Sequence, residues 1–421
     1  MPKLQVGPGE SLFWADLAEV RASGLEPFML YRLELSLEHK TKFRSLAYYF
    51  SDEHGALDLA REAPVFGMYK GIDKMGLFTA LYTHPGERQT AKLLLNPLPE
   101  FLEYTLSLYH REETRALDTV KLARKLIHPG ITREPIKHDK LEGALYCPKT
   151  RGPEKLPCIL DLYGVAMGTK EHRAAMLAAQ GYCVLALAIF GTGKLSKKHE
   201  DVTSEYLQLA VDFLTQLPYT QSRCAVVGTS FGGTLGYHLT FEKPEVACAV
   251  SINGQRGHYM VSQMNAGGEK LPWTPVLPHN LPNIDHYGGF ISYGRMYGSC
   301  ELDEEHMLRF EKLRQDQHLL YIAGGQDRAI DAQVQGREIE RLLESNGVGK
   351  QFELLELPDC GHIIDPPYMP LNDFLYQGGR YMAFGGDPYP HGVGQHVAWK
   401  KLLEFLEKHI GPGTCITGNK L

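Results

Sequence analysis

Ser230 stands in a short run whose residue types suit nucleophilic chemistry. It is the centre of Gly-Thr-Ser-Phe-Gly, residues 228–232, between an apolar run and a helical pattern. A serine at a sharp strand-to-helix turn takes strained backbone angles, so the residues two positions away must be small. The helix that follows directs its N-terminal dipole and free amides at the same point. Such runs also occur by chance, and the motif alone fits a tight structural turn equally well.

An acid and a histidine follow Ser230 in the chain order that a hydrolase with this turn requires. Asp327 comes just after the apolar run HLLYIAGG, and His362 lies in a loop after the next run, QFELLELPD. The imidazole would take the serine proton, and the carboxylate would orient the ring and stabilise its protonated form. The sequence therefore predicts a catalytic triad of Ser230, Asp327 and His362.

Other residues could fill the roles of acid and base. Asp327 could be a helix cap or a turn residue, with Asp331 or Asp359 as the acid, and His362 could be a structural loop histidine. One further histidine lies in an insertion and two lie near the final helix, and all three are less well placed. These are His258, His391 and His396.

Two backbone amides are needed to hold the oxyanion that forms when a serine attacks a carbonyl. The Phe231 amide, directly after the nucleophile, is one candidate. The loop LYGVAMG, residues 162–168, offers Val165 as the second, although the same loop reads equally as an ordinary turn. This chemistry needs no metal and no prosthetic group, so no cofactor is expected.

From about residue 157 onward, buried strands alternate with helical patterns. Continuous apolar runs such as CILDLYG, YCVLALAIF and ACAVSING are typical of strands that are buried on both faces. The alternation predicts an α/β fold with a doubly wound, mostly parallel sheet, and it places the candidate site at the carboxyl ends of the strands. Helices are expected at residues 170–181, 204–218, 233–244, 304–315, 331–347 and 394–410.

The first 140 residues have a different pattern. Partial period-two alternation at residues 28–39, 43–52 and 89–98 predicts an antiparallel β-sandwich. Residues 98–110 could form a helix by spacing alone, but the nearby prolines and the alternating aromatic residues favour a strand. We therefore predict an N-terminal β-sandwich domain over residues 1–140 and a catalytic domain over residues 141–421.

Composition excludes several classes of protein. A formal net charge of −6 gives no reason to expect a nucleic-acid partner. No apolar run approaches the ~18 residues of a membrane span. The eight cysteines include no CxxC pair, and several lie in apolar runs, so we expect buried thiols in a reducing compartment rather than a disulfide framework.

The two ends of the chain bear on its location in the cell. The start has neither the apolar core of a signal peptide nor a transit-peptide pattern, which favours the cytoplasm. The ending GNKL loosely resembles a peroxisomal signal, so the peroxisome is the alternative. Nothing in the sequence specifies an oligomeric state.

Five longer stretches carry a resemblance to a known family. They are residues 55–81, 171–190, 249–254 (AVSING), 361–371 (GHIIDPPYMPL) and 384–409. On these stretches the chain resembles the acyl-CoA thioesterase and bile acid-CoA:amino acid N-acyltransferase family. The resemblance implies an α/β-hydrolase domain that hydrolyses fatty acyl-CoA to free fatty acid and coenzyme A, with Ser230, Asp327 and His362 as the triad. It also implies an N-terminal domain that helps to shape the active-site entrance.

The identity of residue 230 bears on the reaction within that family. Members that resemble this chain but form amides use cysteine as the nucleophile, and a thioester acyl-enzyme favours attack by an amine over attack by water. Ser230 therefore favours hydrolysis. The alternatives are N-acyl transfer to glycine or taurine, a non-catalytic acyl-CoA or lipid-binding protein, and an ordinary carboxylesterase or dienelactone-type hydrolase.

Two further stretches are candidates for substrate contacts. Residues 253–298 are poor in charge and rich in aromatic residues, methionine and glycine, so part of this stretch, including Met260 and Met264, could line an acyl tunnel. It fits an irregular surface insertion equally well. The lysines at 194, 197 and 198 could meet coenzyme A phosphates, although a solvated loop explains them as well.

Overall fold

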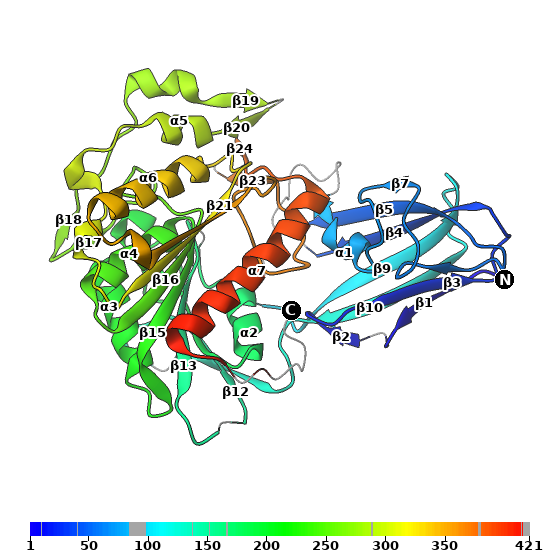
Figure 1. Ribbon diagram of the computed structural model, residues 1–421, viewed down its shortest axis with the longest axis horizontal. Coiled ribbons are helices and arrows are strands. Elements are labelled where there is room, and N and C mark those ends of the chain that lie inside the picture. Colours follow the sequence, from blue (N-terminus) through cyan, green and yellow to red (C-terminus); the bar gives the residue numbers. More distant parts are fainter. Residues whose placement is uncertain are drawn as a thin grey trace.

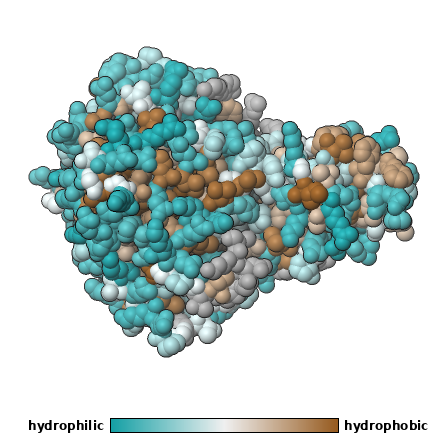
Figure 2. All heavy atoms as spheres, viewed as in Figure 1, coloured by the Kyte–Doolittle hydropathy of each residue, from teal (hydrophilic) through white to brown (hydrophobic). Residues whose placement is uncertain are grey.

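The computed structural model describes residues 1–421 except residues 10, 40, 84–97, 137, 151, 166, 288, 378–379, 414 and 416–421. Figure 1 shows an N-terminal body of strands beside a larger body of strands and helices, with the long helix α7 (Pro388–Ile410) running across the larger body. Figure 2 shows a largely hydrophilic surface on the larger body, with hydrophobic atoms gathered toward the middle of the molecule.

Within the described residues, the N-terminal strands form two packed sheets. The first takes the order β1 (Lys3–Gly7), β3 (Glu19–Ser23), β6 (Leu57–Asp58). The second takes the order β2 (Ser11–Phe13), β10 (Asp118–Lys125), β9 (Phe101–His110), β4 (Leu30–Glu38), β5 (Lys42–Phe50), β7 (Phe66–Gly67), with β8 (Tyr82–Thr83) also on β5. Apart from the parallel pair β2–β10, the pairs are antiparallel.

Alternating side chains of the two sheets meet in one core, which confirms the β-sandwich. Leu33, Leu35 and Leu37 of β4 are buried together with Leu4 and Val20 of the other sheet. The predicted strand within residues 98–110 is confirmed as β9. The predicted strand at residues 89–98 lies, apart from residue 98, outside the described residues.

The larger body is built on an eight-stranded sheet within the described residues. Its order is β11 (Ile131–Pro135), β12 (Gly143–Pro148), β14 (Cys183–Leu187), β13 (Leu156–Leu162), β15 (Thr220–Thr229), β16 (Val246–Ile252), β21 (His318–Gly324), β22 (Phe352–Leu357). The pairs β11–β12 and β12–β14 are antiparallel, and all later pairs are parallel. The predicted mostly parallel, doubly wound sheet is confirmed, and this order is that of an α/β-hydrolase.

Helices cover both faces of this sheet. Helix α2 (His172–Ala179) and α7 share a core with one face. Helices α3 (Ser204–Thr215), α4 (Phe231–Glu242) and α6 (Ala332–Ser345) share a core with the other. The smaller elements are α1 (Gly76–Thr79), η1 (His199–Asp201), β17 (Asn265–Ala266), β18 (Glu269–Lys270), η2 (Pro278–Asn283), β19 (Asp285–Tyr287), β20 (Phe290–Ser292), α5 (Gly294–Ser299), η3 (Glu304–His306), η4 (Phe310–Lys312), η5 (Gly349–Gln351), β23 (Phe374–Gln377) and β24 (Arg380–Ala383).

The helix predicted at residues 304–315 is wrong. The segment forms two short 3₁₀ turns, η3 and η4, with extended backbone at Met307 between them. The Leu308 amide donates to the Arg256 carbonyl at 3.0 Å, and the His258 amide donates to the His306 carbonyl at 2.8 Å. Pairing with residues 256–258 therefore replaces the hydrogen bonds that a helix would have made within the segment.

The expectation of unpaired thiols is wrong for one pair of cysteines. Cys147 and Cys183 form a disulfide, with their Cα atoms 4.5 Å apart. The antiparallel register of β12 and β14 brings these two residues opposite each other, although they are 36 residues apart in the chain. Among the other cysteines, Cys158, Cys224 and Cys248 are buried free thiols, as predicted.

The proposed division at residue 140 remains a prediction. Strand β11 of the eight-stranded sheet already begins at Ile131, ahead of that division. Among the described residues, no helix is long and apolar enough to cross a membrane.

Candidate active site

Ser230 lies on the sharp turn between β15 and α4. Its φ of 57° and ψ of −126° are strained for a residue with a side chain. The Ser230 amide donates to the Ile252 carbonyl at 2.8 Å, which ties the turn to the end of β16. A Cβ atom on Gly228 would collide with the Gly232 carbonyl, and one on Gly232 would lie 2.6 Å from the Leu162 carbonyl oxygen. The turn therefore requires glycine on both sides of the serine.

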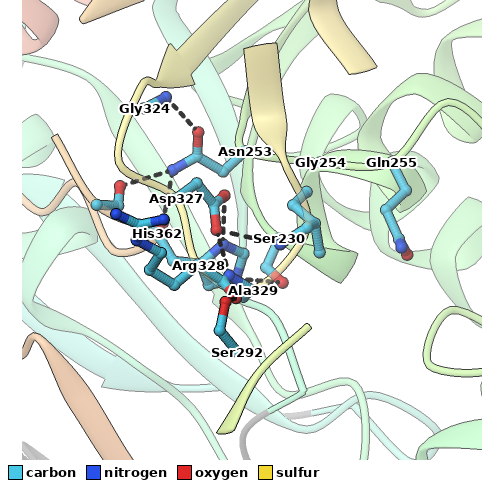
Figure 3. A network of polar contacts seen from close by, with 12 residues as sticks. Ser230, Asn253, Gly254, Gln255, Ser292, Gly324, Asp327, Arg328, Ala329 and His362 are labelled. Carbon is cyan, nitrogen blue, oxygen red and sulfur yellow. Dashed lines mark hydrogen bonds and ion pairs between the residues drawn. The ribbon is translucent and has the colours of Figure 1, made fainter. Parts of the chain in front are cut away.

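The structure brings the three predicted triad residues together. His362 Nε2 lies 3.0 Å from Ser230 Oγ, and His362 Nδ1 lies 2.8 Å from Asp327 Oδ2 (Figure 3). The other carboxylate oxygen, Oδ1, accepts the amides of Ala329 at 2.7 Å and Ile330 at 3.1 Å. Both His362 and Asp327 are buried. The carboxylate is thus fixed with one oxygen aimed at the imidazole.

The alternative acids and bases lie elsewhere. Asp331 occupies the N-cap position of α6, and Asp359 is exposed. His258 Nδ1 contacts the Ser262 carbonyl at 3.0 Å, and the His396 ring packs on Tyr368.

His391 holds the loop that carries the candidate base. Its Nδ1 accepts the Gly361 amide at 3.0 Å, next to His362. Burial lowers the pKa of His391 to about 4, so the ring is neutral near pH 7 and can serve as an acceptor. His391 is therefore a structural partner of the His362 loop.

The two candidate oxyanion donors lie on either side of Ser230. Phe231 is the first residue of α4, and Val165 lies in the loop after β13. That loop passes against Ser230, since a Cβ atom on Gly164 would lie 2.8 Å from the Ser230 Cβ atom. Among the described residues, neither candidate amide has an acceptor within the protein. Their role as oxyanion donors remains a prediction.

Asn253 links the loops of the candidate acid and base. It follows β16, has a φ of 50° and is fully buried. Its Oδ1 accepts the Gly324 amide at 2.7 Å, and its Nδ2 donates to the carbonyls of Gly361 at 3.1 Å and His362 at 2.7 Å (Figure 3). Asparagine tolerates this left-handed backbone better than most residues. In the sequence, AVSING carries only a family resemblance, and nothing in it pointed to this role of Asn253.

Asn253→Asp is expected to lower kcat by about 10- to 100-fold with little change in KM, because small misplacements of reacting groups have effects of this size. Aspartate keeps an oxygen that accepts the Gly324 amide. Its second carboxylate oxygen, however, would replace the Nδ2 donor and face the carbonyl oxygens of Gly361 and His362. Steady-state kinetics on an activated ester measures the effect. Asn346→Asp, at the exposed end of α6, is the matched control. Equal kcat values for the two variants would contradict the role of Asn253.

A buried cation lies next to the turn that carries Ser230. Arg173 Nε donates to Asp161 Oδ1 at 2.7 Å, Nη1 donates to Thr229 Oγ1 at 2.6 Å, and Nη2 donates to the Leu162 carbonyl at 3.0 Å. Burial opposes the charge of Arg173, but the nearby Asp161 outweighs it and the pKa of the guanidinium is raised. Arg173 thus joins the end of β13 to the residue before Ser230. The sequence offered no signal for this pair beyond a charge in each apolar stretch.

A second buried cluster joins the β13 loop to the loop of His362. The Tyr163 hydroxyl donates to Asp365 Oδ1 at 2.7 Å, and His172 Nε2 lies 2.9 Å from the same oxygen. Burial raises the pKa of Tyr163 well above its usual value, so this side chain stays a hydroxyl donor. Asp365 comes three residues after His362. The cluster therefore connects the candidate base to the loop that carries Val165.

The candidate substrate residues have different surroundings. Met264 is fully buried in the core of the larger body, whereas Met260 is 44% exposed. Lys194 contacts the Asp139 carbonyl through Nζ at 3.4 Å. The roles predicted for these residues in substrate binding remain predictions. Among the described residues, no group of three or more His, Cys, Asp or Glu side chains could hold a metal ion.

The sheet order and the strained serine turn define an α/β-hydrolase, and comparison with known proteins narrows this to a family. The model for the "BAAT / Acyl-CoA thioester hydrolase C terminal" family matches residues 202–412. The model for the "Acyl-CoA thioester hydrolase/BAAT N-terminal region" matches residues 16–138. The chain belongs to the acyl-CoA thioester hydrolase/BAAT family, which confirms the resemblance seen in the sequence.

Individual relatives carry the names of both activities in this family. Mouse acyl-coenzyme A amino acid N-acyltransferase 2 is 30% identical, with 93% of this chain and 94% of the relative covered. Human acyl-coenzyme A thioesterase 1 is 29% identical, with 96% of each covered. Among solved structures, carboxyl esterase 2 of the fungus Tuber melanosporum has a TM-score of 0.44 and 13% identity, with 67% of this chain and 87% of that chain covered.

Proposed function

We propose that this protein is an acyl-CoA thioesterase that hydrolyses fatty acyl-CoA to free fatty acid and coenzyme A. The observation that carries the proposal is the 3.0 Å contact between Ser230 Oγ and His362 Nε2 on a strained turn. The nucleophile there is an oxygen rather than a sulfur. The relatives named as acyl-CoA thioesterases support the choice of substrate class.

The first half-reaction transfers the acyl group to the enzyme. Ser230 Oγ attacks the thioester carbonyl carbon while His362 Nε2 takes the hydroxyl proton, and Asp327 stabilises the imidazolium. The amides of Phe231 and Val165 hold the oxyanion. The carbon–sulfur bond then breaks, and coenzyme A leaves as a thiol with the proton from His362. A thiolate is already a good leaving group, so acid assistance matters less than it does for an amide.

The second half-reaction releases the fatty acid. A water molecule gives its proton to His362 Nε2 and attacks the acyl-enzyme carbonyl carbon. The tetrahedral intermediate collapses, the ester bond to Ser230 breaks, and the serine oxygen recovers its proton from the imidazolium. Each step uses only groups of the chain and water.

N-acyl transfer to glycine or taurine is the second candidate. The relatives named as N-acyltransferases are about as similar to this chain as the thioesterases, at 30% identity against 29%. In that reaction an amine would replace water in the second half-reaction. An oxygen ester gives an amine less advantage over water than a thioester does, so Ser230 favours hydrolysis.

A comparison of palmitoyl-CoA with palmitate esters that lack the nucleotide part of coenzyme A tests the substrate class. We expect a much higher kcat/KM for palmitoyl-CoA than for the N-acetylcysteamine thioester of palmitate or for p-nitrophenyl palmitate, because binding energy from the nucleotide contributes to the transition state. Equal or higher kcat/KM for the two truncated substrates would replace the proposal with an ordinary carboxylesterase.

We propose the cytoplasm as the location, with the peroxisome as the alternative. The NKL ending that motivates the alternative lies outside the described residues. One relative, from rat, carries the word mitochondrial in its name. Fluorescence microscopy of the full chain with and without its last three residues separates the two locations.

A further inference from the structure

The segment that follows the candidate base is irregular and yet buried. Residues 364–372, here called the strap, form no helix, and in the described structure they make one isolated bridge, at Leu371. Most of their side chains are buried. Buried irregular backbone needs partners for its polar groups, because water does not reach them. The partners of the strap come from both bodies of the molecule.

The N-terminal β-sandwich supplies hydrogen bonds to the strap from two separate places. The Trp14 indole N–H donates to the Pro367 carbonyl at 2.7 Å. The Leu371 amide donates to the Leu81 carbonyl at 2.9 Å, and the Thr83 hydroxyl donates to the Leu371 carbonyl at 3.4 Å. These contacts join residues almost 300 or more positions apart in the chain, so they depend on how the two bodies pack.

A buried arginine of the sandwich adds further contacts with the strap. Arg124 of β10 is fully buried and donates to the carbonyls of Trp14 and Asp16. Its guanidinium lies 5.4 Å from the ring centre of Tyr368 in the strap and 5.0 Å from that of Phe78, within cation–π range. Tyr368 has a φ of 65°, a backbone conformation that persists only when its surroundings impose it. Arg124 thus fixes both the Trp14 turn and one side of the strap.

The larger body holds the opposite side of the strap. Asp365 contacts Tyr163 and His172, and Gln395 Nε2 of α7 donates to the Met369 carbonyl at 3.2 Å. The strap is therefore held between the two bodies, and it begins two residues after His362.

We propose that the N-terminal β-sandwich is a positioning element for the base. By holding the strap through Trp14 and Arg124, it holds His362 at hydrogen-bond distance from Ser230. Triad geometry must be kept to within about 0.5 Å, so a loop fixed on one side only would lose activity. The inference rests on the proposed function because the measured reaction is the hydrolysis of palmitoyl-CoA. The contacts themselves do not depend on the substrate.

Trp14→Phe tests the proposal in the full chain. It removes the indole N–H that binds the strap and keeps an aromatic ring in the sandwich. Tyr31→Phe is the matched control, because Tyr31 is buried in the same sandwich and its hydroxyl accepts the Glu26 amide at 2.9 Å, away from the strap. Each variant thus loses one hydrogen bond of a buried aromatic side chain to the backbone.

Two readouts separate positioning from general loss of stability. For Trp14→Phe we expect kcat for palmitoyl-CoA about tenfold lower, KM within about twofold, and a matching fall in the rate at which a fluorophosphonate probe labels Ser230. For Tyr31→Phe we expect both rates near those of the wild type at a similar melting temperature. Hydrogen exchange of residues 363–372 should rise in Trp14→Phe alone.

The proposal is overturned if Trp14→Phe labels and turns over at the wild-type rate, or if both variants lose the same activity. Should Trp14→Phe fail to fold, Thr83→Val, which removes the hydroxyl bonded to the Leu371 carbonyl, carries the same expectation. A wild type that is labelled by the probe but releases no coenzyme A would refute the proposed function alone, because the labelling comparison needs no thioester.

Discussion

Asp327→Asn is expected to lower kcat by about 10⁴-fold while the fold stays intact. Oδ1 of Asp327 accepts the amides of Ala329 and Ile330, and Oδ2 faces His362 Nδ1. An asparagine would keep its carbonyl oxygen on the two backbone amides, so its NH₂ group would face Nδ1. The imidazole would then carry its proton on Nε2, which could no longer accept the proton of Ser230.

Steady-state hydrolysis of palmitoyl-CoA and fluorophosphonate labelling of Ser230 both measure this loss. Asp359→Asn is the control, because Asp359 was an alternative acid by sequence and is exposed in the structure. It should keep wild-type kcat. The reverse result, an active Asp327→Asn and an inactive Asp359→Asn, would move the acid to the other position.

Arg173→Met is expected to lower the free energy of unfolding by about 3–5 kcal/mol. The side chains of Arg173 and Asp161 are 1% and 0% exposed, so the variant leaves the Asp161 carboxylate buried without its cation. The Thr229 hydroxyl next to Ser230 loses its donor as well. Urea unfolding followed by near-UV circular dichroism measures the change.

Two comparison variants identify the cause of that loss. Arg337→Met breaks the ion pair between Arg337 and Glu356, in which the Arg337 side chain is 61% exposed. It should change the free energy of unfolding by less than about 1 kcal/mol. Asp161→Leu combined with Arg173→Met removes both buried charges and should recover part of the stability. An Arg173→Met variant as stable as Arg337→Met would show that the buried pair contributes little.

The sequence was sufficient for the triad geometry because the constraints on it are local or topological. Gly228 and Gly232 mark the turn around Ser230 by size alone. Asp327 and His362 follow two apolar runs that become neighbouring parallel strands, β21 and β22. Strands of one parallel sheet end on the same edge, so chain order is enough to bring the three side chains together.

The features that sequence reasoning missed depend on long-range register and packing. Asn253 contacts loops more than 70 and 100 residues away, and these contacts appear only once β16 lies beside β21. Cys147 and Cys183 meet through the register of β12 with β14. The segment at residues 304–315 has helical spacing but pairs with residues 256–258 instead, so tertiary contacts override its local preference.

The N-terminal β-sandwich was predicted from alternation, but its contacts with the strap were not. Trp14 and Arg124 lie outside the stretches whose alternation predicted the sandwich. Their partners, Pro367 and Tyr368, lie in a stretch that carries a family resemblance but no pattern that indicates a contact with the sandwich. A contact between two folding units leaves no periodic signal in either of them.

Release of coenzyme A thiol from palmitoyl-CoA tests the central claim most directly. Wild type and Ser230→Ala are each incubated with and without glycine or taurine, and thiol, free palmitate and amide are measured. We expect wild type to release thiol and palmitate in equal amounts whether or not an acceptor is present, and Ser230→Ala to be at least about 10³-fold slower. Undiminished release by Ser230→Ala, no release by wild type, or amide in place of palmitate would contradict hydrolysis through a serine acyl-enzyme.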